Sequence, residues 1–429
     1  MAVNEWLGTT NEEWSTTTNW SRGVVPEASD DVQFSTTSRN CKLGAAGRKC
    51  RSLKLKSGAT YTGKIITAAG ALSIGDATAG EGNVALDLTG ITVEVTNESW
   101  TLNFVSTSGT QQTINFGSQS VRNVKVEGTG SSYLLESELK SVAASTLTHT
   151  KGTFTSNGKT IDIGLFSGTG ASTRTLNIEN SLFKLKAEGV TLWDFTTTTG
   201  LTFSAAGSTI EIPNANAQAV GTSIGSLFIG GGKTFGNLTV GNSAVTAPTQ
   251  PALEVTGSNT WATIANNTSK APKAITASIS GTLLTVTAGG PVAIGSALVG
   301  AGVTTGTVVL KRESGETWEL SASQTVASES MESFAPGIVF AVGSTQTVTG
   351  YEGNGKSGAP ARLASAKPGE QFTMKKASGQ VSVDWQRIKD SKVDAEPAWY
   401  AGANSVLTNT TNWKGEAPPE SATAICILL

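Results

Sequence analysis

Carboxylates are the side chains in this chain that could cleave a glycosidic bond. A glycosidase needs two carboxyl groups roughly 5–10 Å apart around the sugar. The candidates are Asp162, Asp194 and Glu211 in the middle of the chain, and Asp384, Asp390 and Asp394 near its end. Asp162 alternates with Ile161 and Ile163, as in a strand whose polar side chains face solvent. Few basic residues accompany the middle carboxylates. We interpret them as solvated positions and predict no catalytic residues.

Histidine and cysteine are too scarce to indicate a metal centre. The one histidine, His149, excludes a multi-histidine zinc site, and its place in an alternating segment predicts a solvent-facing ring. Cys41, Cys50 and Cys426 are an odd set without a CxxC pair, although Cys41 and Cys50 could pair across a hairpin. Acidic residues are dense over 390–396 but lack the spacing of a calcium loop. No metal or cofactor is predicted.

Tryptophans are the second group that could bind a ligand, because exposed aromatic rings stack on sugars. The chain has ten of them. Trp100, Trp193, Trp261 and Trp385 lie in or beside alternating segments, where core packing is the expected role. Trp193 followed by Asp194 resembles a sugar-stacking pair, and these two residues are the candidate glycan contact.

Charge argues against nucleic acid as a partner. Charged residues make up 15% of the chain and the formal net charge is −2, so the electrostatic attraction to phosphate is missing. One basic cluster alternates with apolar residues, which predicts a solvated strand face; its members are Arg48, Lys49, Arg51, Lys54 and Lys56. The sequence shows no signal peptide and no run of about 18 apolar residues. We expect no membrane insertion.

Short alternating segments must position these side chains. Most are followed by glycine or by a Ser/Asn cluster, and they recur over roughly two hundred residues; examples are 52–56, 91–95, 124–126, 160–163, 175–178, 182–185, 208–212 and 237–240. So long a series exceeds one sandwich, and it lacks the Asn-Gly and Asp-Gly pairs of tight hairpins. The sequence predicts an all-β protein built on a parallel β-solenoid, with no strict repeat period, over 46–274 and 336–398.

The two ends carry the same motif. Trp6 and Trp20 are fourteen residues apart, as are Trp399 and Trp413. At one constant offset the other matches are Asn11 with Asn404, 17–20 with 410–413, and 26–27 with 419–420. Open ends of a solenoid need covering, since exposed strand edges template aggregation. Residues 1–45 and 399–429 are therefore predicted to be caps, and a docking role for the same tryptophans is compatible with this.

Residues 275–335 interrupt this series with strand signals that are spaced differently. Five or six strand signals crowd into 275–335, which predicts a small inserted β-sandwich or barrel. Its segments Ser278–Ala288, Val299–Val303 and Ser323–Ser328 resemble a β-module that recurs in tail and virion proteins of tailed bacteriophages. The stretches 343–350, 388–391 and 399–405 are similar to the closing region of glycine- and threonine-rich β-solenoids of phage particles and bacterial surface proteins.

This resemblance implies a structural or adhesive virion protein, exposed as a fibre, spike or capsid decoration, and not an enzyme. The expected partners are other virion proteins and symmetry mates, with a homotrimer favoured, and a host surface glycan. The expected location is the virion, after synthesis in the host cytoplasm. Two alternatives remain: a tailspike that degrades host polysaccharide by hydrolysis or elimination, and a bacterial surface adhesin.

Overall fold

The computed structural model describes residues 2–141, 145–213, 224–241, 252–353 and 355–419. These residues form an all-β protein with two short 3-10 helices, η1 (Thr17–Asn19) and η2 (Glu81–Asn83). No helix in the described part is long and apolar enough to cross a membrane. The chain divides into two compact units: 1–215 with 227–239 and 256–260, and 216–226 with 240–255 and 261–429.

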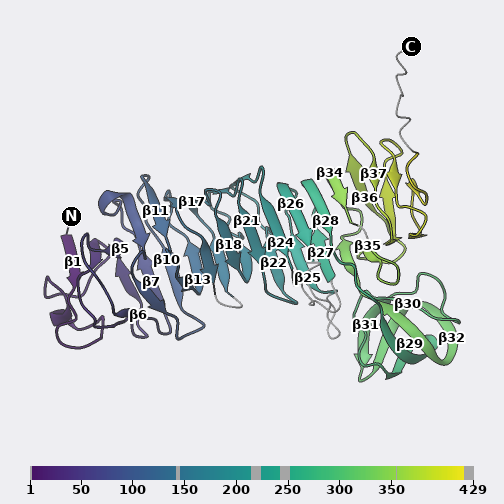
Figure 1. The fold of residues 1–429 in the computed structure, drawn as a ribbon, viewed down its shortest axis with the longest axis horizontal. Helices are drawn as coiled ribbons and strands as arrows, with labels where there is room; N and C mark the ends of the chain where they lie inside the picture. The colour runs from purple at the N-terminus through teal and green to yellow at the C-terminus, as the bar shows by residue number, and fades with distance from the viewer. Residues whose placement is uncertain (1, 142–144, 214–223, 242–251, 354, 420–429) are drawn as a thin grey trace, which may run out of the picture. The chain divides into compact units, whose positions relative to one another are not determined.

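The first unit is a parallel β-solenoid made of three long ladders (Figure 1). The first ladder contains β1 (Ala2–Trp6), β2 (Asp30–Phe34), β5 (Ser52–Leu55), β8 (Val84–Asp87), β11 (Gln111–Asn115), β14 (Ser132–Leu135), β17 (Gly152–Thr155), β20 (Arg174–Asn177) and β23 (Leu201–Ser204). The second contains β4 (Arg48–Cys50), β7 (Ala71–Ile74), β10 (Thr101–Phe104), β13 (Asn123–Val126), β16 (Thr146–His149), β19 (Leu165–Ser167), β22 (Thr191–Asp194) and β25 (Ser226–Ile229). The third contains β12 (Ser120–Val121), β15 (Leu139–Ser141), β18 (Thr160–Ile163), β21 (Leu182–Leu185), β24 (Thr209–Ile212) and β26 (Thr234–Val240). A short ladder of β3 (Cys41–Lys42), β6 (Lys64–Ile66) and β9 (Thr92–Glu94) accompanies the first turns.

From β11 onward, each turn of the solenoid supplies one strand to every long ladder: β14, β15 and β16 form one turn, and β17, β18 and β19 the next. The earlier turns supply β3, β6 and β9 to the short ladder instead of a strand to the third. In the first ladder Gln111 pairs with Ser132, and Ser132 with Thr153, so these turns repeat about every 21 residues. Later turns are longer, since Arg174 pairs with Leu201. Unequal turns explain why no period could be read from the sequence.

Alternation decides which side chains enter the core. In β18, Ile161 and Ile163 are buried whereas Thr160 and Asp162 are partly exposed. Stacking in register then builds continuous columns, such as Leu147, Phe166, Trp193 and Phe228 in the second ladder. All four are buried. The hydrophobic burial of such columns stabilises the stack, since each rung covers the apolar face of the next.

The predicted N-terminal cap, 1–45, is continuous with the solenoid. Its strands β1 and β2 pair in parallel, and β2 pairs in turn with β5. The first two strands of this region are thus rungs of the first ladder, and the loop between them carries Trp20, the second tryptophan of the motif.

The second unit also contains parallel ladders. One is formed by β27 (Ala252–Thr256), β33 (Gly337–Phe340), β35 (Ala361–Ser365), β38 (Gln386–Lys389) and β41 (Val406–Thr408). Another is formed by β28 (Thr260–Asn266), β34 (Thr345–Glu352), β36 (Phe372–Lys376) and β39 (Ser391–Val393). A short one is formed by β37 (Val381–Ser382), β40 (Trp399–Tyr400) and β42 (Trp413–Lys414).

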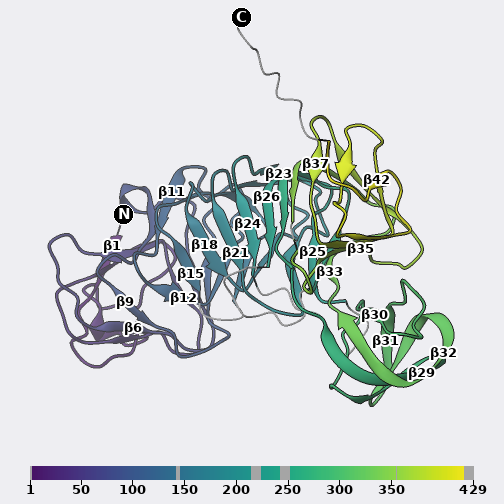
Figure 2. The same ribbon diagram turned by 45° about the vertical axis from the view of Figure 1, so that its right-hand side comes forward.

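An antiparallel module interrupts these ladders. It consists of β29 (Lys273–Ala288), β30 (Ala297–Val299), β31 (Val309–Ser314) and β32 (Thr317–Phe334). Figure 2 shows β29 and β32 as its long curved strands. The fully buried Trp318 lies in its apolar core. Because β27 pairs directly with β33, the chain leaves the ladder and returns to the neighbouring rung. The module lies where the sequence predicts an insertion over 275–335.

Candidate functional site

The N-terminal tryptophans lie where the first ladder ends. Trp6 closes the terminal strand β1, and its ring packs edge to face on Trp20, with centroids 5.1 Å apart. The loop that carries Trp20 also binds the outer edge of β1. Leu7 N donates to Asn19 O at 2.8 Å, and Ser21 N donates to Glu5 O at 3.0 Å. Backbone groups that would otherwise form an open edge are thereby paired.

The C-terminal tryptophans repeat the ring contact on different strands. Trp399 pairs with Trp413 in register between β40 and β42, and their ring centroids lie 5.3 Å apart. Trp413 Nε1 donates to Ser391 Oγ at 3.0 Å. The matching positions 420 and 422–427 lie outside the described residues.

Both tryptophan pairs are buried, at 0% and 2% exposure for Trp6 and Trp20 and 0% and 8% for Trp399 and Trp413. Direct docking through these indole rings would require exposed rings. The geometry therefore favours the capping interpretation of the motif over a contact made by the rings themselves.

Trp193 has the core-packing role expected of it, and the alternative of a glycan contact is wrong for the ring. Trp193 is 0% exposed and stacks on Phe228, with centroids 5.7 Å apart, inside a cluster that includes Phe166 and Phe195. No face of the indole is open to a sugar. Asp194 is partly exposed, and its Oδ1 accepts a hydrogen bond from Thr196 N at 2.9 Å, as in a local turn.

His149 was also predicted incorrectly. Its ring is fully buried beside Phe154, and Nε2 lies 3.1 Å from Gly152 O. Burial lowers the pKa of His149 to about 4, since a charged imidazole would lose its hydration. Cys41 and Cys50 are free and buried, and burial raises the pKa of both thiols. They form no disulfide, and Cys426 lies outside the described residues.

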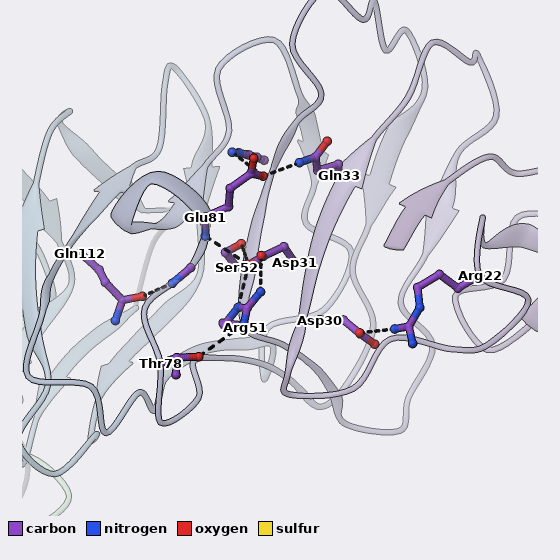
Figure 3. Close-up of polar contacts among 11 residues, drawn as sticks. Arg22, Asp30, Asp31, Gln33, Arg51, Ser52, Thr78, Glu81 and Gln112 are labelled. Atoms are coloured by element: carbon purple, nitrogen blue, oxygen red, sulfur yellow. Dashed lines mark hydrogen bonds and ion pairs between the residues drawn. The ribbon is translucent and has the colours of Figure 1, made fainter. Parts of the chain in front are cut away.

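A buried ion pair replaces part of the predicted solvated basic face (Figure 3). Arg51 Nε donates to Asp31 Oδ1 at 2.9 Å and Nη2 pairs with Oδ2, while Ser52 Oγ donates to Oδ1 at 2.6 Å. The Arg51 and Asp31 side chains are 4% and 0% exposed. Burial alone would raise the pKa of Asp31, but the hydrogen bonds from Arg51 and Ser52 outweigh it and hold that pKa below its usual value. Figure 3 also shows Arg22 bound to Asp30, which precedes Asp31 on β2.

The acidic candidates for glycoside chemistry divide into two groups. Asp162 and Glu211 lie on the outer face of the third ladder, each in register with Lys184 between them. Asp162 also pairs with Lys186 at 2.7 Å, and Glu211 with Lys184 at 4.0 Å. Near the end of the chain, Asp384 Oδ2 accepts from Asn404 Nδ2 at 2.8 Å. Asp394 is partly exposed.

Asp390 belongs to a feature that the sequence did not predict. In the second unit a partly enclosed pocket of about 240 Å³ is lined by residues of the antiparallel module and of the ladder β27-β33-β35-β38. Its charged lining residues are Glu254, Arg362, Lys389 and Asp390. Arg362 and Asp390 are 4% and 1% exposed. Burial lowers the pKa of Arg362 to about 9, lowers that of Lys389, and raises that of Glu254.

Within the described ranges, no group of three or more His, Cys, Asp or Glu side chains could hold a metal ion. Comparisons with protein-family models, with curated proteins and with solved structures each found no match.

Proposed function

We propose that this protein is a structural and adhesive component of a phage virion, exposed on the particle as a fibre, spike or capsid decoration. Three β-strands per turn, stacked through continuous buried columns, make a rigid scaffold whose outward positions repeat from rung to rung. The resemblance of 278–288, 299–303 and 323–328 to a virion module supports placing that scaffold on a phage particle.

The observation that carries the structural role is the covered end of the first ladder. A long parallel stack exposes unpaired backbone groups at its first strand, which is an aggregation hazard. Here the loop after β1 covers that strand: Ser21 N donates to Glu5 O, and Asn19 O accepts from Leu7 N, directly after the strand. A stack whose end is closed in this way suits a protein that persists as a discrete part of a particle.

Electron microscopy tests the proposal directly. Purified phage particles, labelled with antibodies raised against the protein, are expected to carry label at symmetric positions on the head or tail. Negative-stain images of the purified protein are expected to show one symmetric oligomer, a trimer in the leading hypothesis. Particles without label, together with label on the bacterial surface, would support the adhesin alternative.

One observation favours a glycan-degrading activity as a second candidate. Asp162 and Glu211 lie in one outward column two strand spacings apart, which is about 9–10 Å, with Lys184 between them. That backbone spacing lies near the upper end of the roughly 6.5–9.5 Å between the two carboxyl groups of a glycosidase that inverts configuration. Depolymerisation of host capsule or lipopolysaccharide by the protein, abolished in Asp162→Asn and in Glu211→Gln but retained in Asp87→Asn, would establish it.

A further inference from the structure

The pocket of the second unit combines groups that a folded protein rarely leaves without partners. Arg362 Nη1 donates to Gly295 O at 2.8 Å and to Phe334 O at 3.2 Å. Its Nε and Nη2 donate to no residue in the described part of the chain. These two nitrogens carry three of the five N–H donors of the guanidinium, and a nearly buried guanidinium with so few partners is costly, since its charge has lost most of its hydration.

The carboxylates nearby do not fill this deficit. Asp390 Oδ1 accepts from Asn409 Nδ2 at 2.6 Å, and its Oδ2 lies 4.0 Å from Lys389 Nζ. Lys389 Nζ also donates to Gly306 O. The remaining edge of Arg362 thus has the geometry that binds a planar carboxylate through two parallel hydrogen bonds.

Arg362 needs hydrogen-bond acceptors, whereas the carboxylate of Glu254 needs donors. This side chain is half-buried on the pocket wall, and among the described residues it has no hydrogen bond or ion pair. An ionised carboxyl accepts hydrogen bonds only, so a ligand that satisfied it would present hydroxyl groups. Among the other lining residues, Ile294, Val309 and Pro368 carry apolar side chains. Side chains of this kind can pack against the C–H face of a sugar ring.

The volume of the pocket limits the size of the ligand. The pocket holds about 240 Å³, which is below the roughly 300–1,000 Å³ of sites for drug-sized ligands. A single ring with a few substituents is the largest unit that such a volume accepts.

We propose that this pocket binds one acidic sugar residue, of the uronic acid type, with its carboxylate on Arg362 and a ring hydroxyl on Glu254. The inference deepens the proposed adhesive function, on which its biological meaning rests, by naming the class of surface glycan that would be recognised. A uronate at the exposed end or in a side branch of a glycan would enter the pocket, while the rest of the chain stays in solvent.

Isothermal titration of sodium glucuronate into the full-length protein, with glucose and sodium acetate as parallel titrants, tests this assignment. Glucuronate is expected to bind at millimolar concentration or tighter, and glucose and acetate at least tenfold more weakly. Equal affinity for glucose would show that the carboxylate is not recognised. Equal affinity for acetate would show that the ring is not. Either result overturns the proposal.

Variants distinguish loss of the binding site from loss of the folded structure. Arg362→Met removes the cation but also three hydrogen bonds, to Gly295 O, Phe334 O and Ala335 O, so its unfolding midpoint is measured beside its affinity. Ala366→Phe fills the pocket from a half-buried position and leaves those bonds in place. It is expected to weaken glucuronate binding at least tenfold, whereas Ala377→Phe, at an exposed alanine outside the pocket lining, is expected to bind like the unmodified protein. Unchanged binding by Ala366→Phe would overturn the assignment. Immunolabelling of particles is independent of these titrations, so failure of the virion proposal and failure of the sugar site give different results.

Discussion

Trp6 and Trp20 pack edge to face at 67° with their centroids 5.1 Å apart, and the equivalent Trp399 and Trp413 meet at 68° and 5.3 Å. The first pair is joined by an antiparallel bridge and the second by a parallel register. The repeated sequence thus preserves the ring contact while the backbone around it differs. This indicates that the buried aromatic contact, together with the strand end it covers, is what the motif conserves between the two ends.

Trp20→Ala is expected to lower the free energy of unfolding of the first unit by about 3–5 kcal/mol, the usual cost of emptying a fully buried tryptophan site. The substitution also removes the hydrogen bond from Trp20 Nε1 to Trp14 O, which is 2.8 Å long. Urea unfolding followed by circular dichroism measures the change. Leu7→Ala, at an exposed neighbour of Trp6, should stay within about 0.5 kcal/mol of the unmodified protein. Equal effects of the two changes would contradict the capping role.

Arg51→Met is expected to cost about 3–5 kcal/mol, since it leaves the carboxylate of Asp31 buried without its cation. The double variant Asp31→Asn/Arg51→Met should be more stable than Arg51→Met alone, because an amide oxygen still accepts from Ser52 and Glu81 and carries no charge. Chemical denaturation of the three proteins at pH 7 tests this order. A double variant less stable than the single one would contradict it.

Low pH should remove the stabilisation that the ion pair of Asp31 with Arg51 contributes. The pKa of Asp31 is lower in the folded chain than in the unfolded chain. Its stabilisation is therefore present above the unfolded value of about 3.9 and is lost as the pH falls through the folded value. Arg51→Met should lose less stability than the unmodified protein as the pH falls below about 4. If the free energies of unfolding of the two proteins fell in parallel below pH 4, this linkage would be ruled out.

The fold class could be predicted because alternation survives in each strand, as at Ile161 and Ile163, and because the series is too long for a sandwich. The ion pair of Arg51 with Asp31 could not, since it depends on how many residues the turn between two rungs contains. That number varies along the chain. The pocket at Arg362 was unpredictable for the same reason, because its walls come from segments far apart in sequence.

Two wrong predictions have different causes. His149 was assigned to the solvent-facing side of an alternating segment, but it shares the parity of Leu147, and both side chains lie on the buried face of the strand. The glycan alternative at Trp193 rests on the neighbouring Asp194, whereas the core packing expected of the ring is confirmed. The strand has an irregularity in its register between Thr191 and Trp193, so that Leu192 is buried as well, and the sequence does not mark such a bulge.

Cys41 and Cys50 should be unreactive toward a maleimide in the native protein and fully reactive in denaturant. Both are completely buried, and their raised pKa values keep them as thiols, whereas the thiolate is the nucleophile. A Cys426→Ser background leaves these two as the labelled groups, and mass spectrometry counts the adducts. Native labelling as fast as that of a small thiol would contradict the packing of β3 and β4.

His149 should make the folded state sensitive to pH between neutrality and pH 5. The unfolded chain gains a proton on this imidazole near pH 6.5, whereas the folded protein resists it until the pKa of about 4. The unfolded state then binds more protons, so stability falls as the pH drops below about 6.5, by up to about 1.4 kcal/mol per pH unit. Denaturant unfolding at intervals from pH 7.5 to pH 5 measures the slope.

The sequence makes this measurement specific, because His149 is the only histidine and carboxyl groups with ordinary pKa values stay ionised above pH 5. His149→Gln keeps a polar side chain beside Gly152 and cannot titrate in this range. It should lose part of its stability at pH 7.5 and show a flat profile down to pH 5. At pH 5 its stability should therefore lie closer to that of the unmodified protein than at pH 7.5. If the two profiles keep the same slope, the imidazole is not buried in the neutral form, and the inward register of β16 is wrong.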